Sequence, residues 1–143
     1  WGERAFAYLP QKAFLAADWK DWARGYAAAG PADWKRLDGI LGLERILARG
    51  AASLKGLSGG ERQRLCLARV FASPAPYLLL DEPTTWLTAG DRERILCDLL
   101  EFWKRPVRDG APRGAALVSH EPFLGEICPR TVRMEPEPAG AVA

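Results

Sequence analysis

Asp81, Glu82 and His120 are the residues best placed for chemistry, because they follow short apolar runs: YLLL at 77–80 and AALVS at 115–119. Such runs are typical of strands buried in a parallel sheet, and ligands of open α/β sheets bind beyond the carboxyl ends of the strands. An acid at this position can hold Mg²⁺ between nucleotide phosphates, and a second acid aimed differently can polarise an attacking water. Alternatively, the two acids only end a strand and the histidine is structural.

A second stretch that could bind a ligand is LSGGERQR, residues 57–64, which places a hydroxyl and two glycines before a strongly helical run. A helix N-terminus carries about half a positive charge and unpaired N–H groups, and glycine permits close approach to a ligand. Ser58, Gly59 and Gly60 could therefore surround a phosphate oxygen. Alternatively, Ser58 and Glu61 form a capping box that only begins the helix.

Composition places the 143 residues in one globular domain or a large part of one, since 48% are hydrophobic and 27% are charged. A net charge of +2 provides no global basic field, and we expect no nucleic-acid partner. Three cysteines (Cys66, Cys97 and Cys128) and one histidine make no plausible zinc set, and they indicate reduced thiols in a cytosolic compartment. No apolar run approaches the ~20 residues that span a bilayer.

The elements that must position these residues alternate between strands and helices. The apolar run at 4–9, stopped by Pro10, predicts a strand, and helical spacing between 18 and 50 predicts two or three short helices, the second beginning near Pro31 or Asp33. This alternation predicts a parallel α/β sheet interrupted by a helical insert. The other predicted elements are buried strands at 77–80 and 115–119, helices at 59–73, 89–103 and around 121–127, a strand near 130–134, a solvated loop at 104–114 and a frayed tail from 135.

Tryptophans of the predicted insert recur at helical spacing. Trp19 and Trp22 share a face with Tyr26, and Trp34 begins a similar spacing with Leu37. These aromatic side chains could form a docking surface for a membrane partner, although aromatic residues at helical spacing are also typical of a core.

Four motifs resemble those of the ATP-binding cassette (ABC) ATPases. AYLPQ at 7–11 is similar to their Q-loop, and LSGGERQR at 57–64 to their signature motif. YLLLDEPTT at 77–85 is similar to their Walker B motif and the start of their D-loop, and LVSH at 117–120 to their switch-histidine strand. The motifs occur in family order over nearly the whole chain, so the chain is identified as a member of this family with a P-loop NTPase-like sheet.

The resemblance implies a role for each candidate residue. Asp81 would bind Mg²⁺, Glu82 would be the catalytic base, and His120 would contact the γ-phosphate and help organise the water. Gln11 would reach the metal and the water. Because two cassettes of this family face each other head to tail, signature residues would bind ATP held by a second ABC ATPase domain; these are Leu57, Ser58, Gly59, Gly60 and Glu61.

Three departures from the family pattern bear on function. No G-x-x-x-x-G-K-[ST] sequence occurs in the 143 residues, so we expect them alone to bind ATP weakly and to be inactive, with a phosphate-loop segment preceding Trp1 in the complete protein. Thr88 stands where the family usually has aspartate, with Asp91 three residues further on, which puts the coupling between two sites in doubt. Glu61 replaces the common glutamine and improves the capping box.

The resemblance also implies a division of the chain. Residues 1–13 would be a core strand and the Q-loop, and residues 14–56 a helical subdomain. Residues 57–135 would hold the signature helix, Walker B, the D-loop and the switch-histidine core, followed by a flexible tail at 136–143.

We therefore expect the ATP-binding and ATP-hydrolysing subunit of an ABC transporter, which uses Mg²⁺ and couples head-to-tail dimerisation to substrate movement by a transmembrane permease. It would be cytoplasmic and peripheral on the inner face of the cell membrane. One alternative is a soluble ABC protein of the translation-factor type acting on the ribosome, a class that favours Asn-His where this chain has Thr85-Trp86. Another is a non-catalytic partner cassette that only donates its signature helix.

Overall fold

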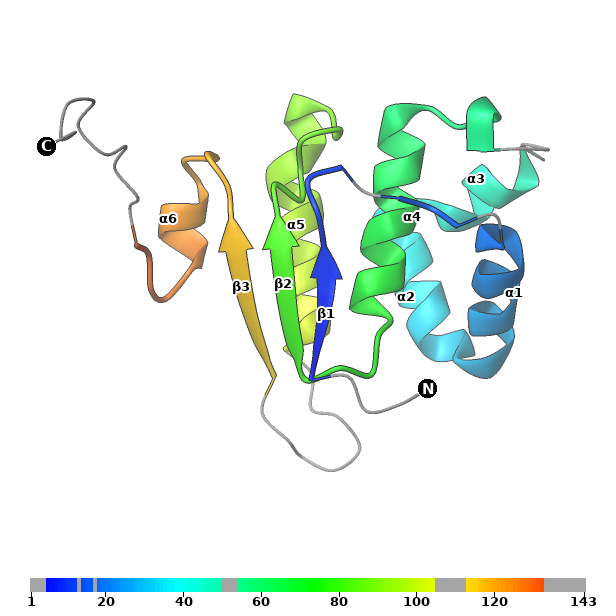
Figure 1. Cartoon of the computed structure of the whole chain (residues 1–143), viewed down its shortest axis with the longest axis horizontal. Helices are drawn as coiled ribbons and strands as arrows, with labels where there is room; N and C mark the ends of the chain where they lie inside the picture. Colours follow the sequence, from blue (N-terminus) through cyan, green and yellow to red (C-terminus); the bar gives the residue numbers. More distant parts are fainter. Residues whose placement is uncertain (1–4, 13, 17, 50–53, 105–112, 133–143) are drawn as a thin grey trace, which may run out of the picture.

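The computed structural model describes residues 5–12, 14–16, 18–49, 54–104 and 113–132. They form a parallel sheet of order β1-β2-β3 with helices packed against it, which confirms the predicted α/β class (Figure 1). The strands are β1 (Phe6–Leu9), β2 (Tyr77–Asp81) and β3 (Gly114–Val118).

The helices follow the predicted spacing closely. The region expected to hold two or three short helices forms three, and Pro31 rather than Asp33 begins the second of them, because proline fits the first position of a helix where no N–H is needed. The signature region forms one helix, and the helix expected at 89–103 has those bounds. The helices are α1 (Trp19–Ala29), α2 (Pro31–Leu41), α3 (Leu43–Ala48), the 3₁₀ turn η1 (Leu54–Gly56), α4 (Gly59–Phe71), α5 (Ala89–Trp103) and α6 (Leu124–Ile127).

The core lies between the sheet and the helices. Helix α4 packs against β1 on one side and against α2 and α3 on the other, and α2 also contacts α5. Trp19 and Trp34 are buried in this core, so core packing rather than docking explains these two tryptophans. Trp22 is partly buried and stacks on Tyr26. The signature helix is thus held between the sheet and the helices of the insert.

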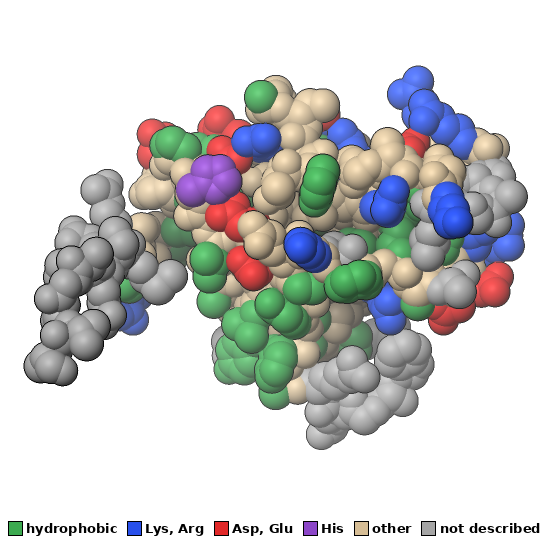
Figure 2. Space-filling model, turned by 45° about the horizontal axis from the view of Figure 1, so that its top comes forward, with side chains coloured by type: hydrophobic (Ala, Val, Ile, Leu, Met, Phe, Trp, Pro, Cys, Tyr) green, Lys and Arg blue, Asp and Glu red, His purple; other side chains and the backbone are tan. Residues whose placement is uncertain are grey.

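One face of the sheet differs from the expectation that its strands are buried on both faces. Leu78 and Leu80 of β2 are 0% and 2% exposed, whereas Tyr77 and Leu79 are 51% and 38% exposed. Successive side chains of a strand point to opposite faces, and the helices among the described residues cover only one of them. The bare side, called here the apolar sheet face, forms the hydrophobic patch of Figure 2 and comprises Phe6, Tyr8, Tyr77, Leu79 and Val118.

The end of the chain also differs from expectation. Helix α6 is shorter than the helix expected at 121–127. The strand expected near 130–134 is wrong for residues 130–132, because they pair with no strand among the described residues, and Val132 is 84% exposed. Residues 133–134, most of the loop expected at 104–114 and the tail from 135 lie outside the described residues.

Candidate functional site

The register of the sheet brings the candidate residues to one edge. Leu9 of β1 is paired with Leu80 of β2, and Leu80 with Leu117 of β3. The segments that follow these strands therefore emerge together at the carboxyl edge, at the arrowheads of Figure 1. Gln11 follows β1, Asp81 ends β2 with Glu82 directly after it, and His120 follows β3.

Glu82 and His120 are in direct contact at this edge. Oε1 of Glu82 lies 3.0 Å from Nδ1 of His120, and the hydroxyl of Ser119 donates to Oε2 over 3.4 Å. The Glu82 side chain is 15% exposed, whereas that of His120 is 73% exposed. The hydrogen bond to Glu82, helped by its negative charge, raises the pKa of His120 above its ordinary value. A sheltered carboxylate thus faces a solvent-accessible imidazole.

The backbone at Glu82 is unusual. Its φ is 48°, the one positive φ of a non-glycine residue among the described residues, and this left-handed conformation costs roughly 1 kcal/mol or more. Hydrogen bonds hold it in place: its N–H donates to Val118 O over 2.8 Å, and the hydroxyl of Thr85 donates to its carbonyl over 3.1 Å. Strain of this kind is concentrated at functional sites, and here it sets the direction of the acid next to Asp81.

The capping box predicted at the signature motif is present. Ser58 Oγ accepts from Glu61 N over 3.2 Å, and Glu61 Oε2 accepts from Ser58 N over 2.8 Å. The hydrogen bonds from Ser58 lower the pKa of Glu61, and Arg49 adds to this effect. The cap uses the N–H groups of Ser58 and Glu61, but not those of Gly59 and Gly60. The two interpretations of the motif are therefore compatible, since a capped helix can still offer glycine N–H groups to an anion.

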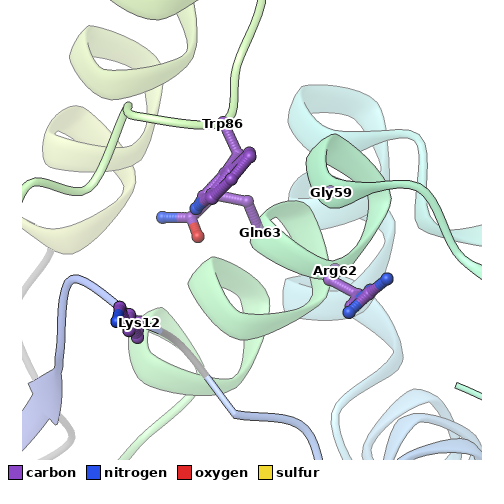
Figure 3. Close-up of a pocket in the computed structure, with 5 residues that line it drawn as sticks. All are labelled: Lys12, Gly59, Arg62, Gln63 and Trp86. Carbon is purple, nitrogen blue, oxygen red and sulfur yellow. The ribbon is translucent and has the colours of Figure 1, made fainter.

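A cleft of about 310 Å³ opens beside this helix end (Figure 3). Trp86 is 59% exposed, and its indole lies against Gly59, where a Cβ atom would be 3.0 Å from Trp86 Cε3. Lys12, from the turn after β1, lies across the cleft from Trp86. Two basic side chains and one aromatic ring therefore line the cleft beside the first turns of α4. The lining residues are Lys12, Gly59, Arg62, Gln63 and Trp86.

A buried hydrogen bond joins the signature helix to the acidic strand end. Gln63, 2% exposed, donates from Nε2 to Pro83 O over 2.7 Å, one residue after Glu82. On the other side of this segment, Glu121 accepts from Thr84 over 3.4 Å and from Arg92 over 2.8 Å. The segment after Glu82 is thus tied both to α4 and to the residue that follows His120.

The predicted residues are partly brought together. Asp81 is half-buried at the end of β2, and Gln11 is exposed after β1, with no hydrogen bond to Asp81, Glu82 or His120 among the described residues. The described residues hold no group of three or more acidic, histidine or cysteine side chains arranged for a metal. A site of one carboxylate nevertheless suits Mg²⁺, which is usually bound by one or two carboxylates together with substrate phosphates.

Several residues of the site were not predicted from the sequence. Gln63, Ser119 and Glu121 all make hydrogen bonds to the segment around Glu82. Gln63 is a polar residue on the buried face of α4. A buried polar side chain requires a hydrogen-bond partner, so a glutamine among the apolar positions of a predicted helix indicates such a contact. Its partner 20 residues away could not be read from the pattern.

Comparison with known proteins defines the class. A family model described as ABC transporter matches residues 3–85, and the chain belongs to this family. Its fold is similar to that of a bacterial Atm1-family ABC exporter with ATP bound, with a TM-score of 0.55, 25% identity and coverage of 86% of this chain and 22% of that one.

Curated relatives are named as import proteins. The taurine import ATP-binding protein TauB of Mesorhizobium japonicum is 38% identical over 86 residues, which covers 60% of this chain and 32% of TauB. The hemin import ATP-binding protein HmuV of Nocardia farcinica is 40% identical over 106 residues, which covers 67% of this chain and 34% of HmuV. The chain thus spans about a third of the length of these relatives. Within the described residues, no helix has the length and apolar character needed to cross a membrane.

Proposed function

We propose that the complete protein is the ATP-hydrolysing subunit of an ABC transporter, working as a head-to-tail dimer at the inner face of the cell membrane with a transmembrane permease. The contact between Glu82 and His120 at the strand edge carries this proposal, because it supplies a base and a partner for it at the edge where α/β sheets bind ligands. Family membership and the import proteins among the relatives support transport over an action on the ribosome.

Glu82 is the general base of the proposed reaction. Its carboxylate accepts a proton from the water that attacks the γ-phosphorus of ATP, and its limited exposure restricts competition from bulk solvent. His120 holds Oε1 of this carboxylate in the present arrangement, and its exposed ring is free to turn toward the γ-phosphate. Gln11 follows β1 at the same edge and contacts the water in this proposal.

Asp81 is the residue that would hold Mg²⁺, which when bound neutralises charge on the phosphate oxygens. Its position at the end of β2 puts it one residue before the base, whose carboxylate contacts His120. The chemistry of a single half-buried carboxylate fits this ion, since the phosphates supply further oxygen ligands.

The amino end of α4 binds the nucleotide that the second domain of the dimer holds. Ser58 keeps the helix start in place through the capping box, and Gly59 and Gly60 offer N–H groups to the γ-phosphate of ATP held by a second domain. The basic side chains of Lys12 and Arg62 beside the cleft favour an anionic ligand. Leu57 is buried, and its carbonyl oxygen accepts two hydrogen bonds from the Arg62 guanidinium, so it stabilises the start of α4.

The proposed division of the chain separates the helices of the insert from the residues of the catalytic site. Residues 14–56, which contain α1 to α3, form the helical subdomain that meets the permease, and residues 57–135 carry the chemistry. The chain of 143 residues contains no phosphate-loop sequence, and we therefore expect no ATPase activity from it alone.

Turnover of ATP by the complete protein tests the proposal. Glu82→Gln should preserve ATP binding and reduce kcat by at least about 100-fold, since general-base catalysis contributes roughly that much. Glu126→Gln is the matched control, because this carboxylate is exposed on α6 and, within the part of the chain that the structure describes, makes no hydrogen bond to Glu82 or His120. Turnover by Glu82→Gln close to that of Glu126→Gln would contradict the role of Glu82. A saturable, Mg²⁺-dependent ATPase rate from residues 1–143 would contradict the expected inactivity.

A further inference from the structure

Arg64 of the signature helix connects three parts of the fold. Its Nη1 donates to Leu41 O, at the end of α2, over 3.3 Å, and its Nη2 donates to Asp91 Oδ2 over 2.8 Å. Leu41 is fully buried and is the last residue of α2 before Gly42 turns the chain with a φ of 65°. The guanidinium therefore satisfies a carbonyl that the helix end leaves unpaired, while it reaches α5 with its other nitrogen.

Asp91 is the acceptor on which these contacts converge. Besides Arg64, the hydroxyl of Thr88 donates to Oδ2 over 2.9 Å, and Arg94 donates to Oδ1 over 2.9 Å. Thr88 precedes α5 at its N-cap position, yet its side chain caps no backbone N–H and instead donates to Asp91. The carboxylate thus ties the residue before α5 to the signature helix.

Two consecutive residues of α4 hold the two ends of the same segment. We call residues 83–88, which lead from Glu82 to α5, the connecting loop. Gln63 binds the carbonyl of Pro83 at its start, and Arg64 reaches Thr88 at its end through Asp91. A shift of α4 is therefore transmitted to both ends of the connecting loop, and the loop directly follows the strained backbone of Glu82.

We propose that Arg64 and Asp91 are positioning residues that fix the connecting loop to the signature helix and to the end of α2, so that a displacement of the helical insert α1–α3 changes the position of Glu82. This inference rests on the proposed role of Glu82 as the base. Neither residue touches substrate in this proposal. Arg64 transmits displacement of α2 through its bond to Leu41 O, and Asp91 passes it to Thr88.

The energetics of the pair favour a positioning role over a purely stabilising one. The side chains of Arg64 and Asp91 are 24% and 29% exposed, so this part-buried ion pair is partly screened by solvent, which limits its contribution to the free energy of unfolding. Geometry matters more at a reacting centre, where a displacement of about 1 Å can cost roughly 100-fold in rate. Loss of the pair should therefore reduce turnover much more than it reduces stability.

A double-mutant cycle in the complete protein tests this inference. Steady-state ATP turnover and thermal unfolding are measured for Arg64→Gln, Asp91→Asn and the double variant. Each single change should reduce kcat by about ten-fold with KM for ATP within about two-fold, and the double variant should be no slower than the slower single variant, because both changes break the same link. Arg94→Gln is the matched control: it removes a partner of the same carboxylate within α5 but leaves the link to α4 intact, and its kcat should be unchanged.

Two more variants keep the test informative if the charge changes impair folding. Arg64→Lys retains the charge but lacks the planar fork that reaches Leu41 O and Asp91 together, so kcat should lie between those of wild type and Arg64→Gln. Thr88→Val removes only the hydroxyl that donates to Asp91 and should reduce kcat less than Asp91→Asn does.

Several results would overturn the inference. These are unchanged kcat in both single variants, effects that multiply in the double variant, an equal decrease in Arg94→Gln, or a raised KM with unchanged kcat. Glu82→Gln separates this failure from that of the proposed function. If Glu82→Gln is inactive while the Arg64 and Asp91 variants turn over normally, only the positioning role is wrong; if Glu82→Gln remains active, the proposed function itself fails.

Discussion

Glu82 Oε1 and His120 Nδ1 lie 3.0 Å apart although the residues are separated by 38 positions in the chain. The contact exists because β2 and β3 are adjacent parallel strands in which Asp81 pairs with Val118. The residue after Asp81 and the second residue after Val118 then leave the sheet at the same edge. The topology of the sheet, rather than closeness in sequence, creates this acid and imidazole pair.

Because the two side chains are in contact, the pKa of His120 depends on the presence and charge of Glu82. The hydrogen bond and charge of Glu82 raise this pKa, Glu121 adds to the increase and Arg92 opposes it. We expect an NMR titration in Mg²⁺-free buffer to give a pKa above the ordinary value of 6.5, and Glu82→Gln to lower it. The signal is unambiguous because the chain has one histidine. Since the folded pKa is raised, the stability from this pair is fully present below about pH 6.5 and is lost as the pH rises through the raised pKa.

Glu126→Gln serves as the control for this titration. It removes a negative charge from exposed α6, and Glu126 is not among the groups that shift the pKa of His120. An equal decrease in both variants, or a wild-type pKa below 6.5, would contradict the contact between Glu82 and His120.

The capping box predicts a measurable loss of stability. Ser58→Ala removes the oxygen that accepts from Glu61 N, and it should decrease the free energy of unfolding by about 1 kcal/mol in urea denaturation. Ser58→Asp is the matched control, because its carboxylate can accept the same hydrogen bond and should retain most of the stability. If alanine and aspartate unfold at the same urea concentration as serine, the cap contributes nothing and Ser58 is free to act on a ligand alone.

The sequence predicted the bounds of helices and strands more reliably than it predicted which of their faces are buried. Helix α5 was predicted with its observed bounds because its apolar residues, among them Ile95, Leu99 and Phe102, have complete helical spacing. By contrast, the bare face at Tyr77 and Leu79 depends on which helices cover the sheet, and an apolar run contains no such information. The strand expected near 130–134 is not formed at residues 130–132, because a strand requires a neighbour to pair with.

The candidate site shows the same division between local and long-range information. The capping box of Ser58 and Glu61 is local and was predicted correctly. The direct contact of Glu82 with His120 and the bond from Gln63 to Pro83 O connect residues far apart in sequence. Predicting such contacts requires the strand register and the packing of α4, which single-residue patterns do not specify.

The apolar sheet face predicts the behaviour of the 143-residue chain in solution. Contiguous exposed apolar surface favours association, so the chain should bind the dye ANS and self-associate at high concentration. Replacing Tyr77 and Leu79 together with threonine should reduce both effects while it preserves the strand, because threonine retains a high β propensity. Phe14→Ser is the control, since Phe14 is 83% exposed but is not part of this face. A decrease of the same size in Phe14→Ser would show that the patch has no special role.

Gly59 and Gly60 are both constrained by Trp86, but by different atoms. A Cβ at Gly59 would lie 3.0 Å from Cε3 of the indole, whereas a Cβ at Gly60 would lie 3.1 Å from the Trp86 carbonyl oxygen. Trp86 is 59% exposed and its indole can move, whereas the carbonyl belongs to the loop that Gln63 and Arg64 hold in place. Gly60→Ala should therefore decrease the free energy of unfolding by about 1–3 kcal/mol, and Gly59→Ala by less.

Removal of the indole separates the two glycines. Trp86→Ala should fully relieve the clash of Gly59→Ala, and the double variant should be as stable as Trp86→Ala or up to about 1 kcal/mol more stable, because alanine favours a helix more than glycine does. The same background should not relieve Gly60→Ala, since every residue at position 86 retains the carbonyl. Urea unfolding of the three single and two double variants decides the question. Rescue of Gly60→Ala by Trp86→Ala would mean that the indole, and not the backbone of the connecting loop, limits the approach to the start of the signature helix.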